Sequence, residues 1–360
     1  MNILDMRTYK YKIKPTKEQV VLIEKHLWCC RFVWNKYLGE RKQAYEEQWK
    51  SLSYYDNAKD LTHLKKDLVW LKEVNAQSLQ TTLKDLNLAY DRFFKKITKF
   101  PRFKSKKNPK NWFHIPQKIK LKGSKLVVPK FQEWIKVIIH RPLLWNIRNA
   151  TITKDNTWYY VAITCDDVAK KLPKTSKNIW IDLWIKDFCI TSDGEKVANP
   201  KFLRAIEDKL NKVQSYYSRH KGKRSLRKLQ RLHSKIANQR KDFLHKVSTK
   251  LIHENQVICL EDLNVKGMMQ NHKLAKSIWE VGWGMFVEFL TYKTEWYGRT
   301  LIKIDRFYPS SKTCNCCGNV KEELKLSERM YHCDHCWASL DRDINAAKNI
   351  LKQGLKQLEE

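Results

Sequence analysis

Apolar and polar residues alternate near the start of the chain and then follow a helical period. Residues 9–13 alternate with a period of two, which is typical of a strand with one buried face. Thr16 and Gln19 have the spacing of a capping box, which predicts that a helix begins here. Helical periodicity then continues to about residue 97. Its clearest apolar stripe, which we expect to form core rather than a ligand site, is Leu79, Leu83, Leu86, Tyr90 and Phe93.

Short stretches with strand periodicity follow between about residues 118 and 164. Their spacing and the turn residues between them predict a small barrel or sheet. Because a strand also precedes the helices, the simplest topology is a β-barrel of residues 1–15 and 111–172 that carries the inserted helical block 16–110. Residues 173–176 (Pro-Lys-Thr-Ser) are typical of a linker.

The second half opens on residues 178–187 (NIWIDLWIKD), an apolar strand with one acid in its middle. Residues two apart in a strand point to the same face, so Trp180, Asp182 and Trp184 share one face. We expect an Asp-Gly turn at 193–194 to join two further strands. The remaining elements predicted are a basic helical region (201–253), strands at 257–260 and 301–304, a helix near 278–297, a cysteine-rich loop and a final helix from about 342.

The net charge of the chain limits the kinds of partner that we expect. The 360 residues include 71 Lys and Arg against 38 Asp and Glu, a formal net charge of +33. Such an excess destabilises the compact state by self-repulsion, and a polyanionic partner, usually a nucleic acid, relieves it. We find neither an apolar run long enough to span a bilayer nor a signal peptide, which argues against a membrane partner. We therefore expect a cytoplasmic, nucleoid-associated protein of a bacterium or archaeon, and leave its oligomeric state open.

Two basic stretches are candidates for nucleic-acid contacts. Residues 95–110 contain eight basic residues and no acid, with Phe100 and Phe103 between them. A run of charge is usually a solvated face, but a long, one-signed run with aromatic residues favours contact with a nucleic-acid backbone. Residues 219–235 form the second stretch. The candidate contacts are Lys95, Lys96, Lys99, Arg102, Lys104, Lys106, Lys107, Arg224, Arg227, Lys228 and Arg231.

Four cysteines have the spacing of a zinc ribbon. Cys314 and Cys317 form one pair, and Cys333 and Cys336 form a second pair after fifteen intervening residues. Each pair can form a knuckle whose thiolates suit tetrahedral Zn²⁺. Because four protein ligands leave no open position, we expect one structural zinc ion; the alternative is four unrelated thiols. The remaining cysteines are expected to be a bystander at Cys316 and core residues at Cys29, Cys30, Cys165, Cys189 and Cys259.

Three acids are candidates for a second metal site. Asp182 lies within a strand, Glu261 closes another strand and Asp343 lies at the start of the last helix. Each has an ordinary explanation, as a buried polar residue, a solvated strand end and an acid favoured by the helix dipole. Together, on a basic chain, they suit two Mg²⁺ ions that act on a phosphodiester.

Several of these segments resemble one protein family. They are NIWIDLWIKDFCITSDGEK, VICLEDLNVKGM, RFYPSSKTCNCCG, HCWASLDRDINAAKNI and, among the helices, LWCCRFVWNKYL and LQTTLKDLNLAYDRFFKK. The chain is similar over nearly its whole length to the transposon-encoded TnpB (OrfB) family. The members of this family are compact RNA-guided DNA endonucleases related to type V CRISPR effectors. By this resemblance Asp182, Glu261 and Asp343 would be the metal-binding catalytic triad, and Asp341 a neighbour that we do not expect to be a ligand.

The resemblance implies a multidomain α+β fold. Residues 173–307 and 339–360 would form a RuvC-like (RNase H-like) nuclease, with the zinc ribbon inserted at 308–338. The barrel would be a wedge-like domain and the helices a recognition lobe that holds an RNA–DNA heteroduplex. The implied activity is Mg-dependent cutting of double-stranded DNA beside a short motif, guided by an RNA from the transposon end.

Two alternatives remain open. The chain could be an RNA-guided DNA-binding regulator that does not cut, as Trp184 beside Asp182 favours. It could also be a zinc-ribbon RNA-binding protein whose acids are structural. In that case Asp182→Ala would destabilise the fold, whereas in a nuclease it would abolish cleavage and leave binding intact.

Tryptophan is unusually frequent and glycine unusually rare, with fourteen and ten residues. Trp180 and Trp184 flank Asp182 where the family would have glycine, and Trp337 follows the second knuckle whereas Gly318 follows the first. The codon UGA is read as glycine in some bacterial lineages and as tryptophan in others, so we expect these residues to be native glycines; the alternative is a degraded site. The same expectation covers Trp28, Trp134, Trp145 and Trp158, whereas Trp34, Trp283 and Trp296 match family tryptophans.

Overall fold

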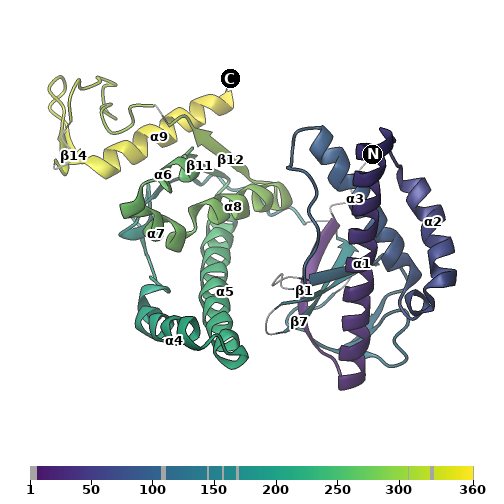
Figure 1. The fold of residues 1–360 in the computed structure, drawn as a ribbon. Coiled ribbons are helices and arrows are strands. Elements are labelled where there is room, and N and C mark those ends of the chain that lie inside the picture. The colour runs from purple at the N-terminus through teal and green to yellow at the C-terminus, as the bar shows by residue number, and fades with distance from the viewer. Residues whose placement is uncertain are drawn as a thin grey trace. The chain divides into compact units, whose positions relative to one another are not determined.

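The computed structural model describes residues 6–106, 111–143, 146–155, 158–167, 170–306, 308–324 and 328–359. The chain divides into two compact units, Met1–Val168 and Ala169–Glu360, close to the boundary expected at residues 172 and 173. Figure 1 draws both units and labels some of their helices and strands. In the part of the chain that the structure describes, no helix is long and apolar enough to cross a membrane.

The first unit joins helices to one antiparallel sheet. Its helices are α1 (Lys17–Gln48), α2 (Tyr54–Asp67), the short 3₁₀ helix η1 (Val69–Lys72) and α3 (Ala76–Phe94). Its strands are β1 (Met6–Lys14), β2 (Asn111–Ile115), β3 (Lys120–Lys122), β4 (Lys125–Val127), β5 (Ile135–Ile138), β6 (Ile147–Lys154) and β7 (Tyr159–Asp166). The strand order is β2-β6-β7-β1-β5-β4-β3. Among the described residues no pairing joins the edge strands β2 and β3, so a closed barrel stays a prediction.

The start of α1 and the apolar stripe of α3 confirm the sequence pattern. The backbone N–H of Gln19 donates to Thr16 Oγ1 at 3.3 Å, and that of Thr16 donates to Gln19 Oε1 at 3.0 Å, which completes the capping box. Leu83 of α3 is fully buried in the same cluster as Ile152 of the sheet. The helices and the sheet thus share one hydrophobic core, although they are expected to be two domains.

The second unit is built around a mixed five-stranded sheet. Its strands are β8 (Asn178–Leu183), β9 (Asp187–Thr191), β10 (Lys196–Ala198), β11 (Val257–Glu261) and β12 (Thr300–Ile304). The order is β10-β9-β8-β11-β12, in which β9 is antiparallel to β8 and β10, whereas β8, β11 and β12 are parallel. A separate hairpin of β13 (Met330–His332) and β14 (Ser339–Asp341) precedes the last helix.

The helices of this unit are more divided than expected. They are the 3₁₀ turn η2 (Arg204–Ile206), α4 (Glu207–His220), α5 (Lys223–Glu254), α6 (Val265–Met268), α7 (His272–Val281), α8 (Trp283–Tyr297) and α9 (Arg342–Glu359). The prediction of one helix near 278–297 is wrong, because Gly282 adopts the left-handed conformation (φ 76°) and ends α7. The basic helical region is likewise divided, at Lys221 with φ 45°.

The two faces of β8 are buried on different sides, as their alternation predicts. Ile179 and Ile181 pack in a cluster with Leu244 of α5 and Phe286 of α8. Trp180, on the other face, packs with residues of β11, β12 and α9. Asp182 therefore lies on the α9 side of the sheet, beyond Trp180 along β8.

Candidate active site and zinc centre

The three acids come from elements that meet at one edge of the sheet. β8 and β11 are parallel neighbours, paired from Val257 to Leu260, and Glu261 is the last residue of β11. The carboxyl ends of parallel strands lie at the same sheet edge, which brings Glu261 near Asp182. Asp343 lies in the first turn of α9, on the side of the sheet to which Asp182 points.

The negative charges of Glu261 and Asp343 act on Asp182. Burial, and then the negative charges of Glu261 and Asp343, raise the pKa of Asp182 to about 7, against the lowering effect of a hydrogen bond from Trp184. Burial also raises the pKa of Glu261. A cation would relieve this repulsion, which is what a metal site of acids requires. The carboxylate oxygens of the three acids do not form a tight cluster. Within the described residues, only the four cysteines have all their ligand atoms within 4.8 Å of one another.

Trp184 occupies part of this site. Its indole Nε1 donates a hydrogen bond to Oδ2 of Asp182. That oxygen is one of the two that Asp182 could offer a metal, so the indole would compete with a metal for it. Exchange of Trp184 for glycine would free it.

An open cleft lies beside two of the three acids. Asp182, Trp184 and Glu261 line it together with Lys201 and Arg204, which the sequence analysis did not single out. Both basic side chains are exposed. They follow β10, and only the fold brings them to the acids, which is why no local pattern marked them. Positive charge beside clustered carboxylates suits a phosphate-bearing substrate.

The four cysteines confirm the expected cluster. Their sulfur atoms lie within 4.8 Å of one another, with Cys314 Sγ 3.6 Å from Cys336 Sγ and Cys317 Sγ 3.6 Å from Cys333 Sγ. Tetrahedral Zn²⁺ with bonds of about 2.3 Å places its sulfurs about 3.8 Å apart, so the geometry fits zinc. Backbone N–H groups of Cys336 and His335, together with neighbouring thiols, lower the pKa of Cys333 to about 6, which favours the thiolate. Cys316 is exposed and lies outside the group.

The two knuckles make the same backbone hydrogen bond, but glycine follows the first and tryptophan follows the second. The N–H of Gly318 donates to the carbonyl of Cys314 at 2.9 Å, and that of Trp337 donates to the carbonyl of Cys333 at 3.0 Å. Gly318 has φ 78° and Trp337 has φ 61°. The left-handed region is strained for residues with a Cβ, so the second knuckle favours glycine as well. Trp337 is also 85% exposed, and glycine would therefore lose little packing.

The other tryptophans differ in what they indicate. Trp49, which the sequence analysis did not single out, ends α1 at φ 52°, where glycine is the usual residue. Trp180 is well packed, but its Nε1 is buried and finds no hydrogen-bond partner in the described part of the chain. Trp28, Trp134 and Trp158 are about half exposed, and their backbones are not left-handed, so they give no support for glycine. Trp145 lies outside the described residues.

Side chains from the ribbon reach the acidic site. Ser310 Oγ donates to Glu261 Oε1 at 3.2 Å. Asn345 of α9 is fully buried, donates to the carbonyl of Thr313 at 2.7 Å and accepts from the N–H of Asn315 at 2.9 Å. The segment that carries the first knuckle is thus tied both to Glu261 and to the helix that presents Asp343.

Asp341 has a different role from Asp343. Its Oδ1 accepts hydrogen bonds from the N–H groups of Asp343 and Ile344, at 2.9 and 3.2 Å. It therefore caps the start of α9, which agrees with its exclusion from the expected ligands.

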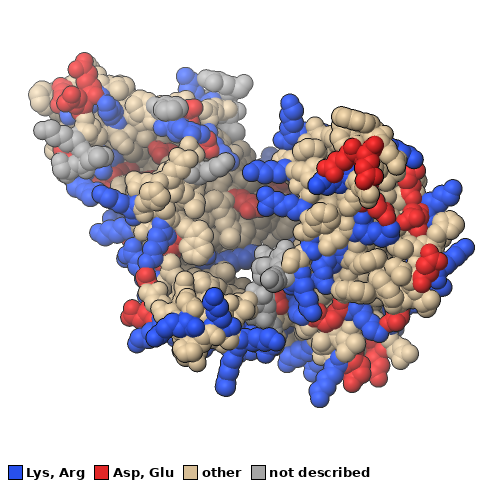
Figure 2. Space-filling model, in the orientation of Figure 1, with Lys and Arg blue, Asp and Glu red and all other residues tan. Residues whose placement is uncertain are grey.

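The candidate nucleic-acid contacts are mostly exposed. Lys95, Lys96, Lys99, Arg102 and Lys106 are exposed in the first unit, and so are Arg224, Arg227, Lys228 and Arg231 on α5. Lys and Arg predominate over the visible face of the α4–α5 hairpin in Figure 2. Lys107 lies outside the described residues.

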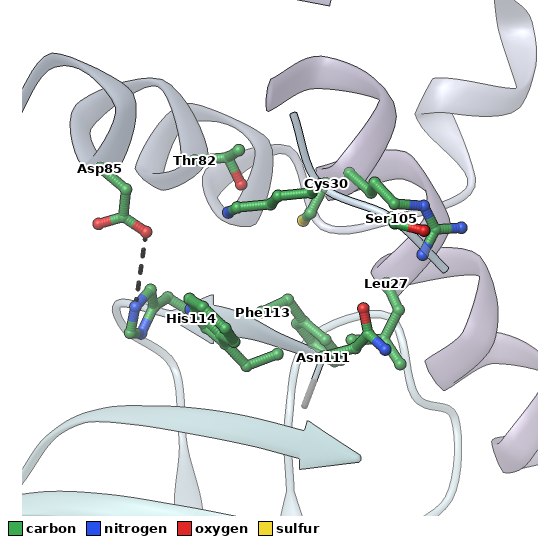
Figure 3. Close-up of a pocket in the computed structure, with 11 residues that line it drawn as sticks. Leu27, Cys30, Thr82, Asp85, Ser105, Asn111, Phe113 and His114 are labelled. Carbon is green, nitrogen blue, oxygen red and sulfur yellow. Dashed lines mark ion pairs between the residues drawn. The ribbon is translucent and has the colours of Figure 1, made fainter. Parts of the chain in front are cut away.

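Lys104 differs from its neighbours. Its Nζ lies 3.7 Å from the centre of the Trp34 ring, and burial lowers its pKa. It lines a small pocket, across which Asp85 of α3 pairs with His114 of β2 at 3.6 Å (Figure 3). A role in anchoring this segment suits Lys104 better than a surface contact.

Comparison with known proteins identifies the family. A protein of Streptomyces pristinaespiralis named "Putative RNA-guided DNA endonuclease" is 38% identical over 97% of this chain and 89% of its own length. "Putative RNA-guided DNA endonuclease InsQ" of Escherichia coli (strain K12) is 30% identical over 97% and 92%. The chain belongs to the TnpB (OrfB) family. Family models match residues 6–50 (helix-turn-helix domain), 159–272 (probable transposase) and 283–350 (Cas12f1-like, TNB domain).

The family models include the three candidate acids and the four cysteines. Asp182 and Glu261 fall in the match over 159–272, and Asp343 and the four cysteines in that over 283–350. Among solved structures, a Cas12f1–sgRNA–target DNA complex matches at 14% identity over 96% of this chain and 99% of that chain, with a TM-score of 0.35. That score is too low to support an argument about the fold.

Proposed function

We propose that this chain is an RNA-guided endonuclease that uses Mg²⁺ to cut double-stranded DNA beside a short target-adjacent motif. Its guide would be an RNA from the transposon end. The observation that carries the proposal is the meeting of Asp182 on β8, Glu261 at the end of β11 and Asp343 in the first turn of α9, where the charges of Glu261 and Asp343 both act on Asp182. The names of two relatives, which describe RNA-guided DNA endonucleases, support it, as does the net charge of +33.

The residues of the site would divide the work. Asp182 and Glu261 offer carboxylate oxygens at the ends of neighbouring strands, and Asp343 offers a third from α9. Two Mg²⁺ ions held there would stabilise the attacking and leaving oxygens of a phosphodiester. Because its pKa is about 7, Asp182 holds a proton in part of the molecules near neutral pH, and it must lose that proton to bind metal. Lys201 and Arg204 would hold the DNA backbone in the cleft.

The sheet order supports a RuvC-like nuclease domain over residues 173–307 and 339–360. Three antiparallel strands followed by two parallel ones, with acids on β8 and at the end of β11, are the arrangement expected of an RNase H-like fold. In this account the zinc of the ribbon (308–338) is structural. The first unit would supply the wedge-like sheet and the recognition helices, whose exposed basic residues face the RNA–DNA heteroduplex.

A second candidate function is an RNA-guided DNA-binding regulator that does not cut. The contact of Trp184 with Asp182 favours it, because the indole occupies an oxygen that a metal would need.

A DNA-cleavage assay with the RNA-loaded protein tests both functions. The chain is loaded with RNA transcribed from its own locus and incubated with Mg²⁺ and plasmids that carry a matched target beside randomised flanking bases. We expect linear product from the nuclease, and loss of cleavage with retained target binding in Asp182→Asn, Glu261→Gln and Asp343→Asn. Asp341→Asn is the matched control, because asparagine caps a helix as well as aspartate does.

The outcomes separate the candidates. Cleavage by the Asp182→Asn form at the native rate would contradict the metal triad. Target binding without cleavage, in both the native chain and Trp184→Gly, would establish the regulator. Cleavage by Trp184→Gly alone would support both the nuclease and native glycine at this position.

A further inference from the structure

A cleft in the first unit is lined by aromatic rings and is separate from the acidic site. Its walls come from α1, from the residues before α2, from the end of α3 and from Phe100, and it encloses about 1330 Å³, open solvent included. The proposed function assigns no role to it.

The aromatic rings present open faces. Tyr90 and Phe94 stack with ring centres 6.2 Å apart, and Phe100 forms T-shaped pairs with Tyr90 and Phe93, with ring centres 5.6 and 5.3 Å apart. Phe94 is nevertheless 70% exposed and Phe100 41% exposed. Exposed neighbouring rings of this kind are the stacking platforms on which proteins bind unpaired bases.

Two buried polar groups lack partners in the same cleft. Arg41 is only 7% exposed, and its guanidinium is held by Asn57 (Nε to Oδ1, 2.6 Å) and Asn87 (Nη1 to Oδ1, 3.3 Å). Its Nη2 and the Tyr90 hydroxyl are buried and have no hydrogen-bond partner among the described residues, and both residues line the cleft. Unsatisfied buried donors are costly, so the cleft favours a ligand with a hydrogen-bond acceptor.

The charges around the cleft favour a base over a phosphate. Glu46 and Asp91 line it beside Lys42, and their carboxylates would repel a phosphate group. Uracil, cytosine and guanine each carry both a ring carbonyl for Arg41 and an amino or imino donor for a carboxylate. The exposed Lys95 and Lys96, directly after α3, can hold the adjoining phosphates.

We propose that this cleft binds one unstacked nucleobase of a single-stranded segment. The base stacks on Phe94 and Phe100 and turns an acceptor toward Arg41 Nη2 and the Tyr90 hydroxyl. The inference deepens the proposed function, since it assumes a nucleic-acid partner, but it requires neither cleavage nor metal.

Binding of single-stranded RNA to the full chain without Mg²⁺ tests this site. The probes are a fluorescent oligouridine and an abasic ribose-phosphate oligomer of the same length and charge. Phe94→Ala is compared with Tyr55→Ala, a matched control because Tyr55 of α2 is 80% exposed and does not line the cleft. We expect Phe94→Ala to bind oligouridine about 5- to 100-fold more weakly, the usual effect of losing one stacking ring, and Tyr55→Ala to bind as the native chain does.

Photocrosslinking locates the base. Oligouridine with 5-iodouridine should crosslink to Tyr90, Phe94 or Phe100, as mapped by mass spectrometry, and Phe94→Ala should reduce this crosslink. Equal affinity for the abasic oligomer, equal weakening in both variants, or crosslinks confined to other residues would overturn the proposal. The binding and crosslinking measurements do not depend on DNA cleavage. Base binding could therefore be observed even if the nuclease assay failed, and DNA cleavage could be observed even if base binding failed.

Discussion

Asp182→Asn should remove a specific pH dependence of folding. The pKa of Asp182 is about 7 in the folded chain, against an ordinary value of 3.8 for an aspartate side chain in water. Between these values the folded state holds a proton that the unfolded chain has lost, so stability falls as the pH rises. A shift of about 3 pKa units corresponds to about 4 kcal/mol. Asparagine keeps the shape and carries no charge, so the variant should approach the native stability near pH 4 and exceed it by a few kcal/mol at pH 8.

Protection of a buried cysteine from alkylation measures the stability of the second unit alone. Cys259 on β11 is fully buried, so a short alkylation pulse in increasing urea labels it only in unfolded molecules. The chains are equilibrated at pH 5 to 8 without divalent metal, pulsed at one fixed pH, and the Cys259 peptide is quantified by mass spectrometry. The native midpoint should fall with pH, and that of Asp182→Asn should fall less.

The control and the role of metal complete this experiment. Glu288→Gln removes an exposed carboxylate of α8 and should keep the native pH slope. Mg²⁺ at pH 8 should raise the midpoint of the native chain and not that of Asp182→Asn, because only the ionised carboxylate binds it. An identical pH slope in Asp182→Asn and the native chain would refute the assigned electrostatics.

Other parts of the account give further predictions. Removing zinc with a chelator, or Cys333→Ser, should unfold the ribbon and reduce Mg²⁺ binding at the acids, because the ribbon contacts Glu261 and α9; calorimetric titration with Mg²⁺ checks this. Trp337→Gly should stabilise the ribbon by about 1 kcal/mol and so raise its melting temperature, because the backbone of Trp337 is left-handed. Gly318→Ala should lower the melting temperature for the same reason. Ser310→Ala should leave the fold intact and raise the pKa of Glu261, whose carboxylate loses a donor, as carboxyl NMR would show.

Local patterns predicted most of the elements and the cysteine cluster because each depends on near neighbours. Alternation placed Trp180 and Asp182 on one face of β8, and the capping box placed the start of α1. The cysteine cluster follows from a spacing that few other structures share. The break at Gly282 was missed because the apolar residues on both sides continue one helical period.

The supporting contacts could not be predicted, because they join residues far apart in the chain. Ser310 meets Glu261 across 49 positions, and Lys201 reaches the acidic cleft only through the turn after β10. Serine, asparagine and lysine are common on surfaces, so no pattern separates these from others. The shared core of the first unit could not be predicted either. Periodicity shows which face of a helix or strand is buried, but it does not show which other element covers that face.

The central claim is that Asp182, Glu261 and Asp343 bind divalent metal at one site. Affinity cleavage with Fe²⁺, ascorbate and peroxide tests it, because iron bound in place of Mg²⁺ cuts the nearby backbone. We expect cuts close to all three acids, stronger in Trp184→Gly than in the native chain, suppressed by excess Mg²⁺ and absent in Asp182→Asn. The absence of such cuts in both the native chain and Trp184→Gly, or their persistence in Asp182→Asn, would contradict the account.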